Sequence, residues 1–259
     1  MKSMKAAEYL ITPWRLHTRI AGIPLGERPS TRSEGYRVQA ALAELTGDRA
    51  IGWKIAATSI GGQKHIGVSG PLAGRLLASR LKANGASVDI GSNIMKVAEA
   101  EFAFRIARDL PPRATPYTVD EVLEASTALY PAIEFPDSRY QDFLRAGEAQ
   151  LIADFACAGW LILGARAPES WRSTDLAAHK VSAWIDGQKA TDGIGSNVLG
   201  DPRIALGWIA NELSREGMGL KADDIVITGT CVVPVLVSAG QHFVADFGTL
   251  GKVSMHLAD

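Results

Sequence analysis

The sequence predicts an α+β fold, in which a small helical N-terminal region at residues 1–50 precedes a β-rich domain at residues 51–259. Apolar residues in the N-terminal region recur at roughly helical spacing. From Ile51 onward, glycine and proline separate short apolar segments, a pattern that is typical of strands joined by turns. The length of 259 residues permits this division into a small and a larger part.

The N-terminal region is expected to contain two helices. Residues 6–22 have a helical pattern that Pro13 interrupts. Ser30 is positioned to cap a second helix over residues 31–47, and Gly47 is expected to end it.

The β-rich domain is expected to contain several short strands and two further helices. One helix is predicted at residues 118–129, where Thr118 and two acidic residues suit a helix start, and the other at residues 201–217, which opens with Asp-Pro and closes with Gly. Strands are expected in the segment around Lys54 and at residues 97–106, 129–135, 156–163, 181–185, 224–228, 232–237, 242–247 and 252–256.

Composition excludes several classes of protein. The 27 Lys+Arg and 28 Asp+Glu residues give a formal net charge of -1, which offers no electrostatic footprint for nucleic acid or an anionic membrane. The sequence has no run of about 18 apolar residues and no signal-peptide core, so a cytoplasmic protein is expected. Cys157 and Cys231 lie in apolar runs and are interpreted as buried thiols.

Two glutamates in the segment KVAEAEFAFRIA form the first candidate site. On a strand, Glu99 and Glu101 share one face and lie about 7 Å apart. A hard cation such as Mg²⁺, Mn²⁺ or Ca²⁺ would offset their repulsion. The alternative is a solvated strand face.

Glu134 strengthens the metal hypothesis because it stands inside the apolar segment LYPAIEFPDSR. A buried carboxylate needs a partner, and a structural salt bridge, for example with Arg139, is the alternative. Three glutamates would supply three oxygens and leave positions for water and a chelating substrate.

Lys54, in the apolar segment GWKIAATS, is the candidate for proton transfer or for holding a carboxylate, unless its side chain reaches out to solvent. The turn at residues 228–230 offers N–H groups and hydroxyls to an anion, unless it is only a turn. Asp154, beside an apolar run, either caps a turn or takes part in catalysis.

These segments together resemble the fumarylacetoacetate hydrolase superfamily, and within it the 2-keto-4-pentenoate hydratase and 4-oxalocrotonate decarboxylase branch. The resemblance extends from about Ser33 to Val253 and rests on an ordered series of segments: GWKIAATS, Gln63 with HIGVSGP, EAEFAF, AIEFPDSR, IADFACAG, GSNVLGDPRIALGWIANEL, GLKADDIVITGT and FGTLGKV. It implies a mixed β-roll or barrel-like body resembling the C-terminal domain of fumarylacetoacetase, a Mg²⁺ or Mn²⁺ ion, and a homo-oligomer.

The resemblance also implies roles for individual residues. The metal ligands would be Glu99, Glu101 and Glu134, and Lys54 would be the active-site lysine. The substrate pocket would be lined by Gln63, Asp154 and Thr230.

Two positions depart from the family pattern. Leu72 follows Pro71 where many hydratases carry an acidic residue, and Phe155 follows Asp154 where the family has asparagine. We expect both Leu72 and Phe155 to contact the substrate and to make the pocket more apolar.

The expected activity is that of a lyase that adds water to a 2-hydroxy-2,4-dienoate and forms a 4-hydroxy-2-oxo acid, as in aromatic meta-cleavage catabolism. A 4-oxalocrotonate-type decarboxylase and an acylpyruvate C–C hydrolase are alternatives on the same scaffold. A non-catalytic metal-binding subunit is an alternative of another class.

Overall fold

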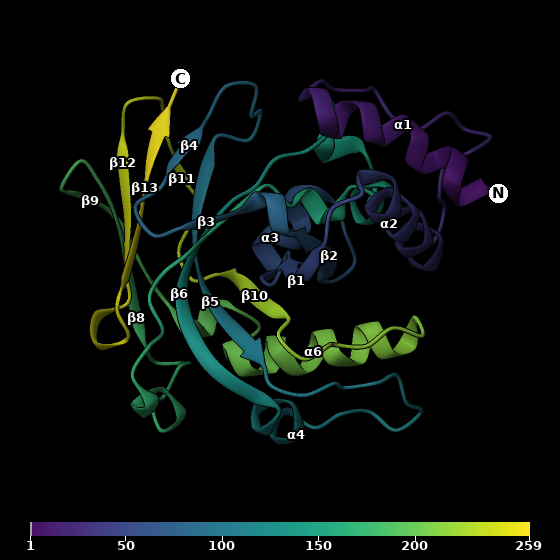
Figure 1. Ribbon diagram of the computed structural model, residues 1–259. Helices are drawn as coiled ribbons and strands as arrows, with labels where there is room; N and C mark the ends of the chain where they lie inside the picture. Colours follow the sequence, from purple (N-terminus) through teal and green to yellow (C-terminus); the bar gives the residue numbers. More distant parts are fainter. Residues whose placement is uncertain (1) are drawn as a thin grey trace.

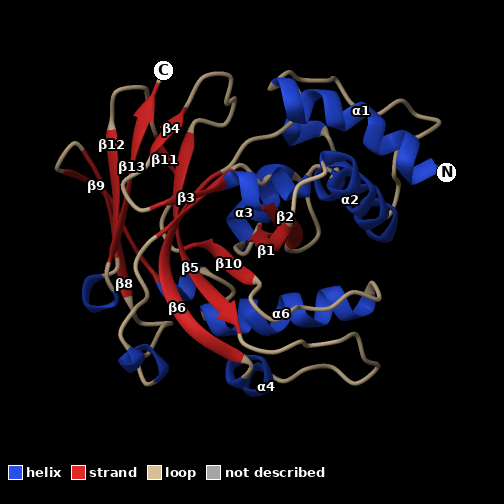
Figure 2. Ribbon diagram, viewed as in Figure 1, coloured by secondary structure: helices blue, strands red, loops and turns tan. Residues whose placement is uncertain are grey.

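The computed structural model describes residues 2–259 and consists of two β-sheets with helices packed beside the larger one (Figures 1 and 2). The N-terminal helices lie on the side of the larger sheet that faces away from the smaller sheet (Figure 1). This arrangement confirms the predicted α+β fold. No helix within residues 2–259 combines the length and the apolar character that crossing a membrane requires.

The larger sheet is mixed. Its strands follow the order β2 (Leu72–Leu77), β1 (Ala50–Ala56), β10 (Ile225–Thr230), β5 (Val97–Ile106), β6 (Ser126–Phe135), β7 (Trp160–Leu163) and β3 (Leu81–Ala83), and β11 (Val235–Leu236) pairs with β5 beside this path.

This sheet curls into a half-barrel, so that its two end strands approach each other. Strands β2 and β3 lie at opposite ends of the strand order, yet only the short 3₁₀ turn Ala78–Arg80 separates them in the chain. Leu76 of β2 and Leu81 of β3 accordingly pack in one apolar cluster with Ala103, Ala132 and Ile227. The concave face of the sheet therefore encloses a small core of its own, and polar residues on this face are shielded from water.

The smaller sheet covers the opposite, convex face. Its strands follow the order β4 (Ser87–Asp89), β13 (Lys252–Ala258), β12 (His242–Asp246), β8 (Lys180–Ile185) and β9 (Gln188–Ile194). Phe102 of β5 meets Phe247 edge-on, with ring centroids 5.0 Å apart. The alternation of β5 thus directs Phe102 and Phe104 into the main core and leaves Glu99 and Glu101 on the concave face.

The helices are α1 (Lys2–Leu16), α2 (Arg32–Thr46), α3 (Ile60–Ile66), α4 (Val119–Glu124), α5 (Glu148–Ala153) and α6 (Pro202–Arg215). Helices α1 and α2 share an apolar cluster with Leu77, Tyr140 and Phe155, which come from the β-rich part of the chain. The N-terminal region is therefore packed directly against the sheet that carries the candidate site.

The ends of three helices differ from the predictions. Helix α1 continues through Pro13, because burial of Ala6, Leu10 and Trp14 on one face outweighs the hydrogen bond that proline removes. Helix α2 is capped by Thr31 rather than Ser30, whose hydroxyl instead donates to Glu34. Helix α4 is shorter than predicted because β6 begins at Ser126.

The strand predictions succeeded best where apolar residues alternate. Residues 97–106 form β5 as predicted. Residues 156–163 do not form a continuous strand: only Trp160–Leu163 is extended, and Phe155–Cys157 is a tight turn. Strands β2, β3, β4 and β9 and helices α3 and α5 were not predicted, because their segments are short or rich in glycine and polar residues.

Candidate active site

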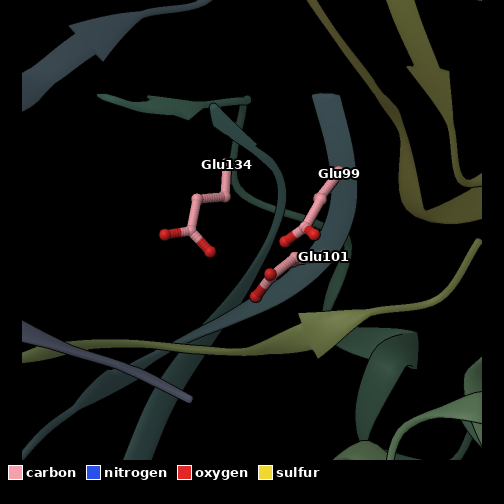
Figure 3. A group of neighbouring side chains, drawn as sticks. All are labelled: Glu99, Glu101 and Glu134. Carbon is pink, nitrogen blue, oxygen red and sulfur yellow. The ribbon is translucent and has the colours of Figure 1, made fainter. Parts of the chain in front are cut away.

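Three carboxylates meet on the concave face of the larger sheet. Glu99 and Glu101 point to the same side of β5 because they lie two residues apart on one strand. Glu134 is the register partner of Glu99 on the antiparallel strand β6. One carboxylate oxygen of each residue lies within 4.8 Å of the other two, and Figure 3 shows the three side chains directed into the same space.

Glu101 and Glu134 are buried, Glu99 is half-buried, and the cluster is incompletely paired. Glu101 and Glu134 are each 1% exposed. Glu101 Oε2 accepts a hydrogen bond from the Gly229 N–H at 2.7 Å, whereas Glu101 Oε1 and both carboxylate oxygens of Glu134 have no hydrogen-bond partner among the residues described. Buried oxygens without donors are costly unless a cation is present, and oxygen donors suit a hard divalent ion. The donor set therefore fits a divalent metal ion.

The pKa values of the clustered glutamates also favour a bound cation. Burial and the neighbouring Glu134 charge raise the pKa of Glu99 to about 7. Burial and the charges of Glu134 and Glu99 hold the pKa of Glu101 well above its ordinary value. Burial is the largest cause of both shifts, and repulsion between the neighbouring carboxylates adds to it. A bound divalent cation would offset this cost.

Lys54 supplies one positive charge to this cluster. Its Nζ lies 3.0 Å from Glu134 Oε1 and donates a hydrogen bond to the Ala156 carbonyl oxygen at 3.0 Å. The ammonium faces Glu134 Oε1, whereas Oε2 has no partner among the described residues and is free to bind a cation. Burial opposes the charged form of Lys54, but the carboxylates, Glu134 foremost, raise its pKa above the ordinary value. The alternative of a salt bridge between Glu134 and Arg139 is wrong, because Arg139 is paired with Asp154 and Lys54 contacts Glu134.

A left-handed turn places the carbonyl that receives the Lys54 hydrogen bond. Phe155, Ala156 and Cys157 have φ angles of 51°, 49° and 61°, a conformation that residues with a side chain rarely adopt three times in succession. Such backbone persists only where its surroundings hold it in place, and it is concentrated at functional sites.

Glycine at position 74 gives this turn its space. Gly74 is the register partner of Lys54 on β2, and a Cβ built there would lie 1.9 Å from the Phe155 carbonyl oxygen. The backbone of the turn can therefore cross the sheet directly beside Lys54 only because residue 74 has no side chain.

Asp154 anchors the start of the turn rather than joining the carboxylate cluster. Its Oδ2 accepts hydrogen bonds from the Ser138 hydroxyl and the Arg139 backbone N–H, each at 2.9 Å. Its Oδ1 is paired with the Arg139 guanidinium, whose Nη2 also donates to the Asp154 carbonyl at 2.7 Å. Asp154 is completely buried in this network.

The other residues that were expected to line the substrate pocket lie in different parts of the structure. Thr230 is the register partner of Glu101, and its hydroxyl donates to the Val232 carbonyl at 2.8 Å. Gln63, on α3, donates to the Ala57 carbonyl at 3.1 Å. Leu72 is completely buried, opposite Ala56 and two residues from Gly74. The side chain of Phe155 points into the N-terminal cluster, where its ring meets Trp14 edge-on.

The structure thus brings together Lys54, Thr230 and the three glutamates, and does not bring Asp154 or the Phe155 side chain to them. Sequence reasoning missed Gly74, the Ala156 carbonyl and the pairing of Arg139 with Asp154. A signal was present only for Gly74, as a glycine within an apolar segment. The anion expected at the turn of residues 228–230 is Glu101 itself, which accepts from the Gly229 N–H.

Comparisons with known proteins agree on one family. The family model for the C-terminal region of fumarylacetoacetate (FAA) hydrolase matches residues 77–258. A 2-keto-4-pentenoate hydratase of Burkholderia vietnamiensis is 35% identical over 213 residues, which are 82% of this chain and 79% of that protein. A 2-hydroxyhexa-2,4-dienoate hydratase of Comamonas testosteroni is 32% identical over 220 residues, which are 84% of this chain and 82% of that protein.

Among solved structures, the 4-oxalocrotonate decarboxylase of Pseudomonas putida G7 superposes on nearly the whole chain. Its complex with magnesium and adipate matches with a TM-score of 0.88 and 25% sequence identity, over 98% of this chain and 97% of that chain. Its complex with calcium and acetate matches with a TM-score of 0.87.

Proposed function

The chain belongs to the fumarylacetoacetate hydrolase family, and from this we propose that it is a metal-dependent hydratase of the 2-keto-4-pentenoate type. Its substrate would be a small 2-hydroxy-2,4-dienoate, and its product a 4-hydroxy-2-oxo acid. Curated relatives named as hydratases of such compounds, at 30–35% identity over most of the chain, support this substrate class.

The observation that carries the proposal is the cluster of Glu99, Glu101 and Glu134, in which one oxygen of each residue lies within 4.8 Å of the others and Glu101 and Glu134 have buried oxygens without a hydrogen-bond partner. These three residues would hold a divalent cation, Mg²⁺ or Mn²⁺. When bound, such a cation would stabilise negative charge on the oxygens of a 2-oxo acid.

The chain's own residues would then orient the cation ligands and the substrate. Lys54 holds the Glu134 carboxylate from one side and presents a buried positive charge to an incoming substrate carboxylate. The Asp154 and Arg139 network acts as a positioning unit, because it fixes the turn whose Ala156 carbonyl fixes Lys54.

The proposed reaction consists of two balanced steps. First, the dienol loses its O–H proton and gains a proton at its terminal carbon, which converts it to a 2-oxo-3-enoate. Water then adds across the remaining double bond: its oxygen bonds to C4, and C3 takes a proton. Lys54 is the residue we assign to proton transfer or to holding the substrate carboxylate during these steps.

Decarboxylation is the second candidate function. It is favoured by the structural likeness to a 4-oxalocrotonate decarboxylase, which extends over 98% of this chain and so includes the N-terminal helices. The same carboxylate cluster would serve, with loss of CO₂ in place of water addition.

The remaining alternatives have less support. An acylpyruvate hydrolase needs a base to activate water at a carbonyl, and within residues 2–259 the metal-binding group consists of glutamates without a histidine. A non-catalytic subunit would have no need for a buried lysine beside a cluster of three carboxylates, two of them buried.

Product analysis by NMR tests the proposal. Protein is mixed with freshly generated 2-hydroxypenta-2,4-dienoate, or with 4-oxalocrotonate, in the presence of Mg²⁺, Mn²⁺ or EDTA. Metal-dependent formation of 4-hydroxy-2-oxopentanoate is expected. Release of CO₂ from 4-oxalocrotonate without hydration of the dienoate would replace the hydratase by the decarboxylase.

The proposal also covers assembly and compartment. The family resemblance leads us to expect a homo-oligomer, and light scattering would give its size. Cys157 and Cys231 are both buried and unpaired, which suits the reducing cytoplasm that we propose as the compartment.

A further inference from the structure

A cavity of about 310 Å³, lined by charged and aromatic side chains, lies between the C-terminal end of α1 and the larger sheet. Three arginines line it: Arg19, Arg80 and Arg139. Lys54 and the three glutamates of the candidate active site do not line this cavity, so it is a separate space. Its volume is sufficient for a small metabolite.

Arg80 is the residue that needs explanation. Its guanidinium carbon lies 4.7 Å from the ring centroid of Trp14 and 4.7 Å from that of Trp160, so it is held between two indoles. Its only side-chain hydrogen bond among the described residues is a long one, 3.5 Å from Nη2 to the Trp14 carbonyl, and no carboxylate there lies within 4.0 Å of it. Burial, together with the charge of Arg139, lowers the pKa of Arg80 to about 10.

The other charges in this cavity do not neutralise Arg80. Arg139 is paired with Asp154, and Asp137 accepts from Arg19 Nη2 and, at 3.1 Å, from the Ile94 N–H. Asp89 also lines the cavity, but it is exposed. Arg19 also donates to the Thr18 and Ser92 carbonyl oxygens, each at 2.8 Å. Arg80 is therefore the arginine of this cavity that no carboxylate of the described residues pairs with.

We propose that this cavity binds a small carboxylate anion, held by the free N–H edge of Arg80. The two indoles restrict the orientation of this guanidinium, and its planar fork matches the two oxygens of a carboxylate. Such an anion would supply the counter-charge that no carboxylate of the described residues provides within 4.0 Å of Arg80. The binding is independent of the proposed hydratase activity, because it uses none of the metal-cluster residues.

Titration of the metal-free protein tests this site. The protein is first freed of metal on a chelating resin. Acetate, succinate and inorganic phosphate are then added separately in Tris buffer, with chloride at matched ionic strength as reference. Without metal, a carboxylate cannot bind through a cation at the glutamate cluster. Calorimetry gives the Kd. We expect saturable binding of a carboxylate that chloride does not reproduce.

Arg80→Met removes the charge and retains an apolar side chain between the indoles. It is expected to weaken carboxylate binding about tenfold or more, the usual effect of losing a charged hydrogen-bond donor. Arg75→Met is the matched control, because Arg75 also lies over a tryptophan, 4.4 Å from the Trp53 ring centroid, and lines a different cavity. This control should bind the anion as the parent protein does.

Three results would overturn the proposal. One is the absence of any carboxylate binding beyond the chloride reference, and another is equal binding by Arg80→Met and the parent protein. The third is a change of oligomer size in Arg80→Met without anion binding by the parent, which would assign Arg80 to a contact between chains. If Arg80→Met does not fold, Arg80→Lys keeps the charge but loses the fork, and it should bind phosphate better relative to carboxylate than the parent does.

Discussion

Glu99 on β5 and Glu134 on β6 stand directly opposite each other in an antiparallel register, and both carboxylates lie on the concave face of the curled sheet. Directly opposed like charges destabilise a strand pair unless something lies between them. The strand register of β5 and β6 therefore also places the carboxylates of the candidate metal site opposite each other.

Glu101→Gln is expected to abolish metal-dependent turnover while the protein stays folded. The substitution removes one oxygen ligand and one buried negative charge, so the metal-free variant should be at least as stable as the metal-free parent. Thermal unfolding with and without Mg²⁺ measures both effects, since a metal at about 100 times its Kd stabilises the parent by about 2.7 kcal/mol. Glu124→Gln, at an exposed glutamate, should behave like the parent. Full activity of Glu101→Gln would exclude Glu101 as a ligand.

Metal affinity is expected to fall as the pH is lowered through neutrality. Burial raises the pKa of Glu99 in the metal-free protein to about 7, so below that pH a proton occupies a site that the metal needs. The loss should approach about tenfold per pH unit for each proton displaced. Calorimetry in buffers of different ionisation enthalpy counts the released protons. An affinity that is constant between about pH 8 and about pH 6 would contradict the raised pKa.

Sequence patterns predicted the structure best where apolar and polar side chains alternate along a strand. The alternation in β5 predicts that Glu99 and Glu101 share a face, and the apolar run around Glu134 predicts its burial. The strand order could not be predicted, because pairing between distant segments depends on packing rather than on local pattern. Glu134 and Glu99 lie on strands that pair in this way, so the sequence alone gave their proximity only as a hypothesis. The register of β5 and β6 establishes it.

The assignment of Asp154 and Phe155 shows a second limit of sequence reasoning. An acidic residue beside an apolar run has no preferred partner in the sequence, and the structure gives Asp154 the neighbouring Arg139 and Ser138. The left-handed turn that follows consists of Phe, Ala and Cys, which carry no signal for positive φ angles. Phe155 was expected in the pocket because it stands where the family has asparagine, whereas its ring meets Trp14.

Lys54→Met is expected to destabilise the metal-free protein by about 3–5 kcal/mol, because it leaves Glu134 buried without a counter-ion. Added Mg²⁺ should restore part of this stability by neutralising the carboxylates. Urea unfolding with and without Mg²⁺ measures both changes. Lys252→Met is the matched control: its ion pair with Asp246 is 2.7 Å long but exposed, so its loss should cost about 1 kcal/mol or less. Equal losses of stability in the two variants would show that the Lys54–Glu134 ion pair contributes no more to stability than an exposed one.

Gly74→Ala is expected to reduce both stability and turnover without touching a metal ligand. The new Cβ would lie 1.9 Å from the Phe155 carbonyl oxygen, so the turn must move and take the Ala156 carbonyl away from Lys54. A loss of about 2 kcal/mol or more is expected from such overpacking. The turnover number should fall in the folded variant at saturating Mg²⁺, because the cation ligands themselves are unchanged.

Gly70→Ala is the control for this substitution, because it lies four residues away and no other atom lies within 4 Å of its added Cβ. It should be neutral or slightly stabilising, since alanine restricts the unfolded chain more than glycine does. Steady-state kinetics and urea unfolding of the two variants, side by side, separate the contact at Gly74 from a general effect of replacing glycine. Normal kinetics in a folded Gly74→Ala protein would mean that the position of the turn does not set the position of Lys54.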